Sequence, residues 1–148
     1  MAFDFGHLAK LKVSTESRAW FTFRMIPGKP QFQVTCASES NPEFYDKVLR
    51  MYRAQAQTMR GIKTGGVDSR MLAEAREQNR KLYPLHVICD WRGVVDANGL
   101  TVPFTREHAA EFVRQLPDWV FDELQEFCEN QANFTGDVGL PDPALAKN

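Results

Sequence analysis

Apolar and polar residues alternate in two short runs near the start of the chain. Residues 19–26 (AWFTFRMI) and residues 31–37 (QFQVTCA) flank the sequence Pro27-Gly28-Lys29-Pro30, which is a strong turn signal. Two alternating runs around such a turn predict a β-hairpin with one buried face. The expected inward-facing side chains of the second run are Phe32, Val34 and Cys36. Because an isolated hairpin is marginally stable in water, we expect it to pack against helices.

A helical period begins after the hairpin. Asn41 and Pro42 form a favourable helix start, with Asn as N-cap and Pro at the first helical position. The apolar stripe that follows consists of Tyr45, Val48, Leu49, Tyr52 and Ala56. This helix is expected to stop by Gly61, and a second helix to begin at Asp68 or Ser69. The apolar face of the second helix is Met71, Leu72, Ala75 and Leu82.

Residues 85–91 (LHVICDW) fit either a strand or a helix. Pro84 removes a backbone donor and disfavours helix at Tyr83. Beyond it the apolar residues alternate as in a strand, but Val87 and Trp91 also have helical spacing. The interpretation that we favour is a kinked helix that continues to about Trp91.

The strongest local signals lie between residues 87 and 134. Asp96-Ala97-Asn98-Gly99 predicts a tight turn, since Asn and Gly tolerate positive φ. Thr105 is placed to cap a helix that has Glu107 in its first turn. A second amphipathic segment follows Pro117, with Asp118 as its expected cap, so that the two segments suggest an antiparallel αα-hairpin.

Together these patterns predict a small α+β domain that is mostly helical and carries an N-terminal β-hairpin. The expected domain spans residues 1–134. Residues 135–148 (TGDVGLPDPALAKN) lack periodicity and are rich in Gly, Pro and Asp, which indicates a flexible C-terminal tail.

Composition narrows the class of protein. The 148-residue chain has 43% hydrophobic and 25% charged residues and a formal net charge of −1, so neither a polyanion nor a membrane surface is its expected partner. No apolar run reaches the roughly 20 residues that span a bilayer, and the N-terminus does not resemble a secretory signal. Three widely spaced cysteines fit reduced thiols in a cytoplasm better than disulfides.

No pattern in the chain has the spacing of a catalytic or cofactor site. His86 and Cys89 would share a helix face, but neither CxxC pairs nor HExxH is present. The carboxylates of Asp122, Glu123 and Glu126 have the pattern of a solvated helix face, and Gly65-Gly66 lacks a phosphate-loop lysine. A solvated face is also the favoured interpretation of the cations Arg50, Arg53, Arg60 and Lys63, over nucleic-acid binding. We therefore expect no metal, no cofactor and no enzymatic activity.

Trp119 departs from the apolar pattern of its helix. It falls roughly 130° from the centre of the apolar stripe, at about 100° per residue. Two interpretations remain open: the indole folds back over a neighbouring loop, or it is a partner-binding residue of the kind that anchors interfaces.

Residues 82–134 resemble tail assembly chaperones of long-tailed, siphovirus-like bacteriophages. The resemblance rests on the order DW-x-G-V-x-D-xx-G-xx-VPFT, followed by an amphipathic helix, a Leu-Pro break, a second helix and Asn133-Phe134. Its motif residues, which we interpret as fold determinants, are Trp91, Gly93, Asp96, Gly99, Pro103, Phe104 and Thr105.

The resemblance implies a non-enzymatic protein of the host cytoplasm that coats the phage tape measure protein and recruits tail tube subunits, often as a homo-oligomer. Two other functions remain open. One is an interaction protein of another kind, either a structural tail component or an inhibitor of a host system, and the other is an enzyme of a type without a known motif.

Overall fold

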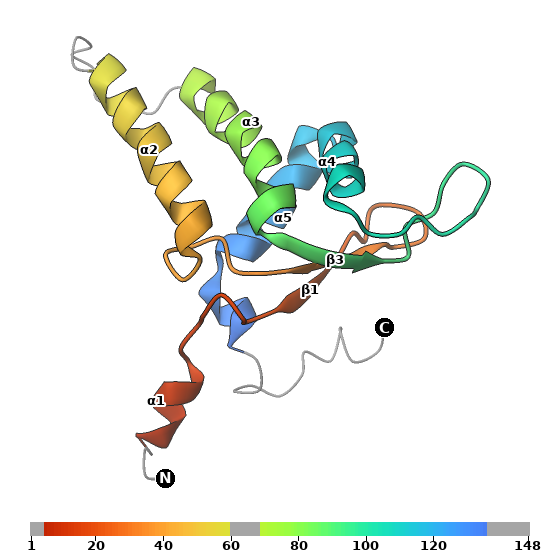
Figure 1. The fold of residues 1–148 in the computed structure, drawn as a ribbon, viewed down its shortest axis with the longest axis horizontal. Coiled ribbons are helices and arrows are strands. Elements are labelled where there is room, and N and C mark those ends of the chain that lie inside the picture. Colours follow the sequence, from red (N-terminus) through yellow and green to blue (C-terminus); the bar gives the residue numbers. More distant parts are fainter. Residues whose placement is uncertain (1–4, 60–68, 136–148) are drawn as a thin grey trace.

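The computed structural model describes residues 5–59 and 69–135 of the chain (Figure 1). Its elements, in chain order, are α1 (Gly6–Lys10), β1 (Ala19–Thr22), β2 (Gln31–Val34), α2 (Pro42–Met59), α3 (Ser69–His86), β3 (Ile88–Arg92), α4 (Arg106–Gln115), α5 (Asp118–Glu129) and the 3₁₀ helix η1 (Gln131–Phe134). The predicted fold class, α+β and mostly helical with an N-terminal hairpin, is confirmed.

The predicted hairpin is the first part of a three-stranded antiparallel sheet with the order β1-β2-β3. β1 pairs with β2 from Ala19 opposite Val34 to Thr22 opposite Gln31. The predicted turn closes through the Lys29 amide, which donates to the Ile26 carbonyl at 2.9 Å. All three side chains expected to face inward are buried, namely Phe32, Val34 and Cys36.

The interpretation of residues 85–91 as a kinked helix is wrong. α3 ends at His86, and Ile88–Arg92 forms strand β3 on the free edge of β2. The Thr35 amide donates to the Val87 carbonyl at 2.8 Å, so pairing with the sheet begins as soon as the helix ends. These residues form a strand because the edge of β2 carries backbone N–H and C=O groups that need hydrogen-bond partners.

Pro84 does not end α3 either, contrary to the expectation for Tyr83. Both residues are buried within the last turns of the helix, and the Val87 amide donates to the Tyr83 carbonyl at 2.9 Å. The carbonyls of Pro84 and Leu85 accept from Arg106 Nη1 at 2.8 and 2.7 Å. Arg106 thus caps the last carbonyls of α3, and the burial of Tyr83 and Pro84 holds this turn in the helix.

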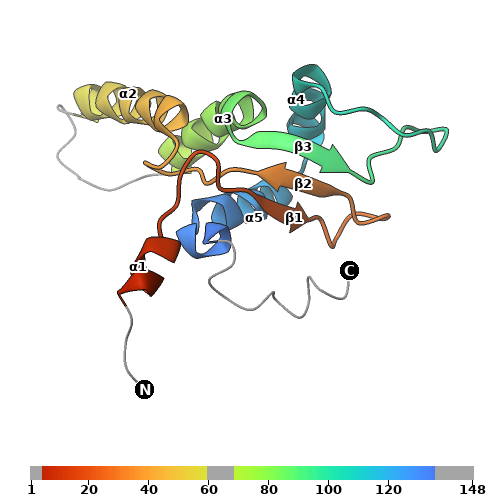
Figure 2. The ribbon, with the colours of Figure 1, turned by 60° about the horizontal axis from the view of Figure 1, so that its bottom comes forward.

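One face of the sheet forms the core. Phe21 lies opposite Phe32, and Phe32 lies opposite Trp91, so the three rings project from the same face. Phe112 of α4 contacts Phe32 at a centroid distance of 4.8 Å, and Phe127 of α5 contacts Phe21 at 5.3 Å. Helices α4 and α5 therefore cover this face, and α5 passes behind the strands in both ribbon views (Figures 1 and 2).

The helices differ from expectation in how they pair. α2 and α3 run side by side, and α4 packs against α3 (Figures 1 and 2). The expected αα-hairpin of α4 and α5 does not form, because Leu116 and Pro117 are both extended, with ψ of 134° and 149°, and send α5 in a new direction. Asp118 is the first residue of α5 and not its cap, whereas Asn41 precedes α2 as predicted.

The end of the described chain is packed. Phe134 is buried and contacts Phe127 at 6.0 Å, so η1 belongs to the fold. Of the expected tail, residues 136–148 lie outside the described residues, as do Arg60, Lys63, Asp68 and the Gly65-Gly66 pair. In the part of the chain that is described, no helix has the length and apolar character to cross a membrane.

Tyr83 provides a test of the core. Burial raises the pKa of its hydroxyl well above the ordinary value, and the hydroxyl has no hydrogen-bond partner among the described residues. Because an unsatisfied buried hydroxyl is costly, we expect Tyr83→Phe to raise the free energy of unfolding by about 1 kcal/mol. Urea denaturation measures this, with the exposed Tyr52→Phe as an unchanged control. A loss of stability in Tyr83→Phe would show that the hydroxyl is paired.

Candidate partner-binding groove

Trp91 forms the floor of the candidate site. Its ring is buried, stacks on Phe32 at 5.8 Å and meets the edge of Phe104 at 5.5 Å. Its indole Nε1 donates to the Val102 carbonyl at 2.9 Å. The ring also lies parallel to His108 of α4, with the centroids 6.5 Å apart. One side chain thus joins β3, the returning loop and α4.

The chain between β3 and α4 forms a ribbon, residues 93–102, that projects from the sheet (Figure 1). Gly93 has a φ of +76°, a conformation that residues with a side chain rarely adopt, so glycine is strongly favoured at the turn out of the sheet. The Val102 amide donates to the Val94 carbonyl at 2.9 Å, which pairs the two sides of the ribbon.

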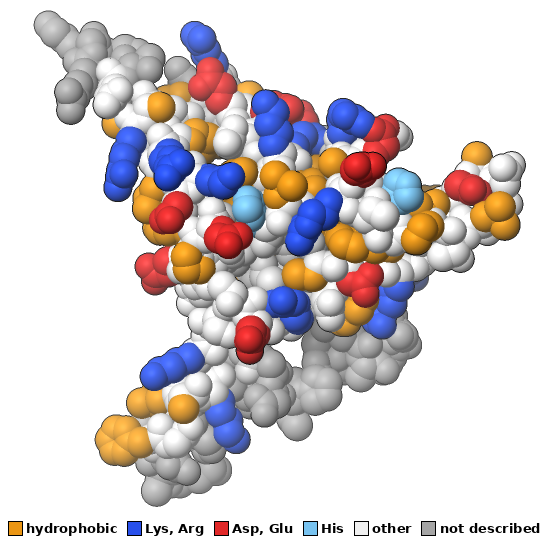
Figure 3. Space-filling model, in the orientation of Figure 1, with side chains coloured by type: hydrophobic (Ala, Val, Ile, Leu, Met, Phe, Trp, Pro, Cys, Tyr) orange, Lys and Arg blue, Asp and Glu red, His pale blue; other side chains and the backbone are white. Residues whose placement is uncertain are grey.

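Asp96 closes the tip of the ribbon, as its predicted turn requires. Its Oδ1 accepts from the amides of Asn98 at 2.8 Å and Leu100 at 3.0 Å. Its own amide donates to the Leu100 carbonyl at 2.8 Å, and Gly99 adopts a φ of +80°. Because this network fixes the backbone, the exposed side chains of Val95 and Leu100 are held on a rigid tip, where Figure 3 shows apolar side chains beside one acidic side chain.

Helix α4 forms the opposite wall. The Thr105 hydroxyl accepts from the His108 amide at 3.0 Å, which is the predicted N-cap, and Glu107 lies in the first turn. His108 Nδ1 lies 2.8 Å from the Pro103 carbonyl, so this nitrogen is the protonated one and donates. These bonds fix the start of α4 against the base of the ribbon.

A groove of about 600 Å³ lies between the ribbon and α4. Its lining residues are Ile26, Trp91, Val94, Val95, Asp96, Ala97, Val102, His108, Glu111, Phe112, Gln115, Leu116 and Pro117. Most are apolar, and the exposed His108, Glu111 and Gln115 add polar groups along α4. An apolar depression with a few polar groups is the usual form of a binding site.

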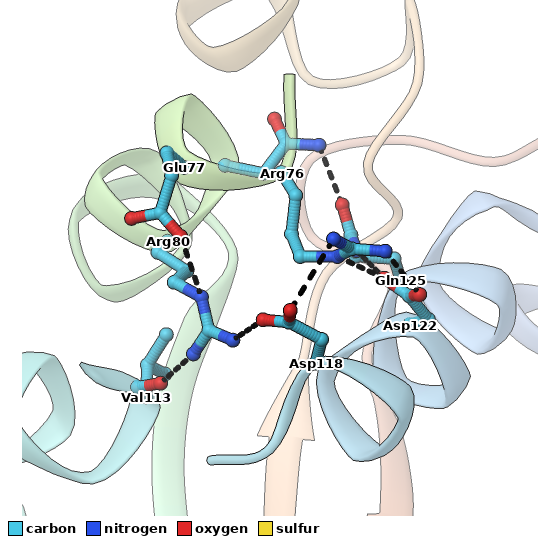
Figure 4. Close-up of polar contacts among 8 residues, drawn as sticks. Arg76, Glu77, Arg80, Val113, Asp118, Asp122 and Gln125 are labelled. Atoms are coloured by element: carbon cyan, nitrogen blue, oxygen red, sulfur yellow. Dashed lines mark hydrogen bonds and ion pairs between the residues drawn. The ribbon is translucent and has the colours of Figure 1, made fainter. Parts of the chain in front are cut away.

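The groove ends at Pro117, where α5 begins, and α5 is held to α3 by ion pairs (Figure 4). Arg76 Nε and Nη2 each donate to one carboxylate oxygen of Asp122 at 2.8 Å, and Arg80 Nη2 donates to Asp118 at 2.6 Å. The hydrogen bond from Arg76 lowers the pKa of Asp122, and burial opposes it. We call these four residues the α3–α5 clamp.

The clamp is extended by two further contacts. Arg80 Nη1 donates to the Val113 carbonyl of α4 at 2.6 Å, so the same guanidinium joins three helices (Figure 4). Asn79 Nδ2 donates to Gln125 Oε1 at 2.7 Å. Trp119 lies between the two clamped aspartates in sequence and is 58% exposed. The clamp therefore fixes the helix turn that presents this indole to solvent.

Two of the three cysteine thiols are buried in the core. Burial raises the pKa of Cys128 well above its ordinary value, and Cys36 is also buried. His86 and Cys89 lie on different elements, α3 and β3, and not on one helix face. The described residues contain no group of three His, Cys, Asp or Glu side chains that could hold a metal ion.

Comparison with known proteins identifies the family. The sequence model described as "YdaY prophage protein" matches residues 39–137, which include β3, the ribbon, α4 and α5. The chain belongs to this family. It is accordingly a phage-derived protein, which agrees with the bacteriophage origin implied by the sequence. Neither a curated protein nor a solved structure matches the chain.

Within this YdaY family member, the motif residues meet around the groove. Trp91, Gly93, Asp96 and Gly99 build its floor and ribbon, and Thr105 caps its wall. Trp119 lies on the next helix and does not line the groove.

Sequence reasoning missed the clamp, because it assigned Asp122 to a solvated face. The signal was present as a pair of arginines and a pair of aspartates, each spaced i, i+4 on its own helix.

The clamp predicts a pH-dependent contribution to stability. Because the pKa of Asp122 is lower when folded, its ion pair stabilises at neutral pH and is lost as pH falls through the folded-state value, below about pH 4. Asp122 is half exposed, so we expect Asp122→Asn to cost roughly 0.5–1 kcal/mol at about pH 7. Urea denaturation at several pH values should show the two curves converging in acid. Glu123→Gln is the matched control, and an undiminished gap near about pH 3 would contradict the assignment.

Proposed function

We propose that this protein is a tail assembly chaperone, a non-catalytic protein that binds the tape measure protein and tail tube subunits in the host cytoplasm during virion assembly. The observation that carries the proposal is the apolar groove beside the rigid ribbon, with Val95 and Leu100 exposed at 56% and 65%. Its membership of a prophage family and its resemblance to tail assembly chaperones support the same assignment.

The geometry suits a helical partner. A tape measure protein is long and helical, and its apolar stripe needs cover until the tube forms around it. An amphipathic helix laid in a groove is recognised through its apolar anchors at i, i+3, i+4 and i+7, and Phe112 and Leu116 line the α4 side of this groove. The preorganised ribbon reduces the entropy lost on binding.

Trp119 supplies a second contact in this proposal. Exposed indoles are frequent hot spots, because they bury a large area with little loss of rotamer freedom. Its helix is immobilised by the clamp, so the indole is presented in a defined direction without lining the groove itself. A partner that spans the groove and the start of α5 would reach both.

Co-expression with candidate tail proteins tests the proposal. We expect a soluble complex with a long helical tail protein, with a mass by light scattering that gives its stoichiometry and any homo-oligomer. Leu100→Ser and Trp119→Ala should each weaken partner binding by more than about tenfold, as loss of an interface hot spot does. Leu72→Ser is the matched control, since Leu72 is 59% exposed on α3 away from the groove.

Two results would contradict the proposal. If the protein stays alone and leaves the tail protein insoluble, it is not a chaperone for that protein. If it is retained in purified virions, it is a structural tail component, because a chaperone leaves before the particle is complete.

A further inference from the structure

A second pocket, of about 520 Å³, lies at the other end of the strands and shares no lining residue with the groove. It forms where the segment before β1, the start of α2, the end of α3 and the start of α4 meet. Three of its lining side chains are basic: Arg18, His86 and Arg106. Its size is in the range of small-ligand sites.

Backbone carbonyls hold the two guanidinium groups in place. Arg106 Nη1 donates to the carbonyls of Pro84 and Leu85, and Arg18 Nη1 donates to the carbonyl of Thr15. Among the described residues neither arginine forms an ion pair with a carboxylate. Four other described arginines do so, namely Arg70, Arg76, Arg80 and Arg114. The two guanidiniums are therefore positioned without being neutralised.

Hydrogen-bonded polar side chains also line the pocket. Thr35 and Asn41 are buried, and Asn41 Nδ2 donates to Thr35 Oγ1 at 3.1 Å and to the His86 carbonyl at 2.8 Å. His86 Nε2 is buried and has no partner among the described residues. Its Nδ1 lies 3.5 Å from Glu43, the one carboxylate among the lining residues. Glu43 is mostly exposed, so it does not fill the pocket.

The thiol of Cys89 lies near both guanidinium groups. Burial raises the pKa of this thiol, the charges of Arg18 and Arg106 act to lower it, and the charge of Asp90 acts to raise it. Both guanidiniums are therefore close enough to one lining side chain to stabilise negative charge there. Arginine presents a planar fork of donors that matches the oxygens of carboxylate and phosphate groups.

We propose that this pocket binds a small anionic group, a phosphate or a carboxylate, between the guanidinium groups of Arg18 and Arg106. The buried polar floor and His86 provide further hydrogen-bonding groups at the same place. The site is separate from the groove and does not depend on the chaperone assignment.

NMR titration of the full ¹⁵N-labelled chain tests this site with two probes, inorganic phosphate and succinate, at constant ionic strength. We expect saturable shifts at the amides of Asn41, Ile88 and Cys89 with at least one probe. Arg18→Gln should weaken that binding at least about tenfold, the effect of losing a hydrogen bond between charged groups. Arg24→Gln is the matched control, because Arg24 is exposed on the hairpin and does not line the pocket.

The outcomes separate clearly. Saturation by phosphate alone or by succinate alone supports the site and identifies the anion, and saturation by both supports their shared chemistry. If Arg18→Gln does not fold, Arg106→Gln replaces it in the titration, and it should also weaken anion binding. The proposal is overturned if neither probe saturates, or if Arg24→Gln weakens binding as much as the pocket variants do.

Discussion

The indole of Trp91 connects the sheet to everything that follows it in the chain. Its ring stacks on Phe32 in the core, and its Nε1 donates to the Val102 carbonyl at the base of the ribbon. A buried hydrogen bond of this kind contributes about 1 kcal/mol, and each aromatic pair adds roughly 0.5–1.5 kcal/mol. Without this residue the ribbon would lose its anchor to β3, and α4 would lose the surface on which His108 and Phe112 rest.

Local signals predicted the parts of the fold that local chemistry determines. The hairpin at Pro27-Gly28, the turn at Asp96 and the cap at Thr105 each depend on residues a few positions apart. The same was true of the helix start at Asn41. In these cases the required backbone conformation and its hydrogen-bond partners are encoded within one short segment.

The errors arose where a distant partner decided the outcome. Residues 85–91 fit both a helix and a strand, and pairing with β2 selected the strand β3. Pro84 remained helical because it is buried in the core beside Tyr83, and Arg106, 22 positions later, donates to the last carbonyls of the helix. Asp122 does not belong to a simply solvated face, because it forms an ion pair with Arg76, which lies 46 positions earlier in the chain. The groove could not be predicted for the same reason, since its walls come from the ribbon and α4 only after Trp91 has joined them.

The placement of the two candidate sites follows from how the chain is held at opposite ends of the sheet. At the ribbon end, hydrogen bonds within the turn pair its backbone amides. The apolar side chains of Val95 and Leu100 can therefore point into solvent while the backbone polar groups stay paired. At the other end, Arg106 donates to the last carbonyls of α3 and Arg18 to a loop carbonyl, and neither guanidinium forms an ion pair with a carboxylate among the described residues. One end is therefore suited to apolar surface and the other to an anion, and a partner that carries both would be oriented along the sheet.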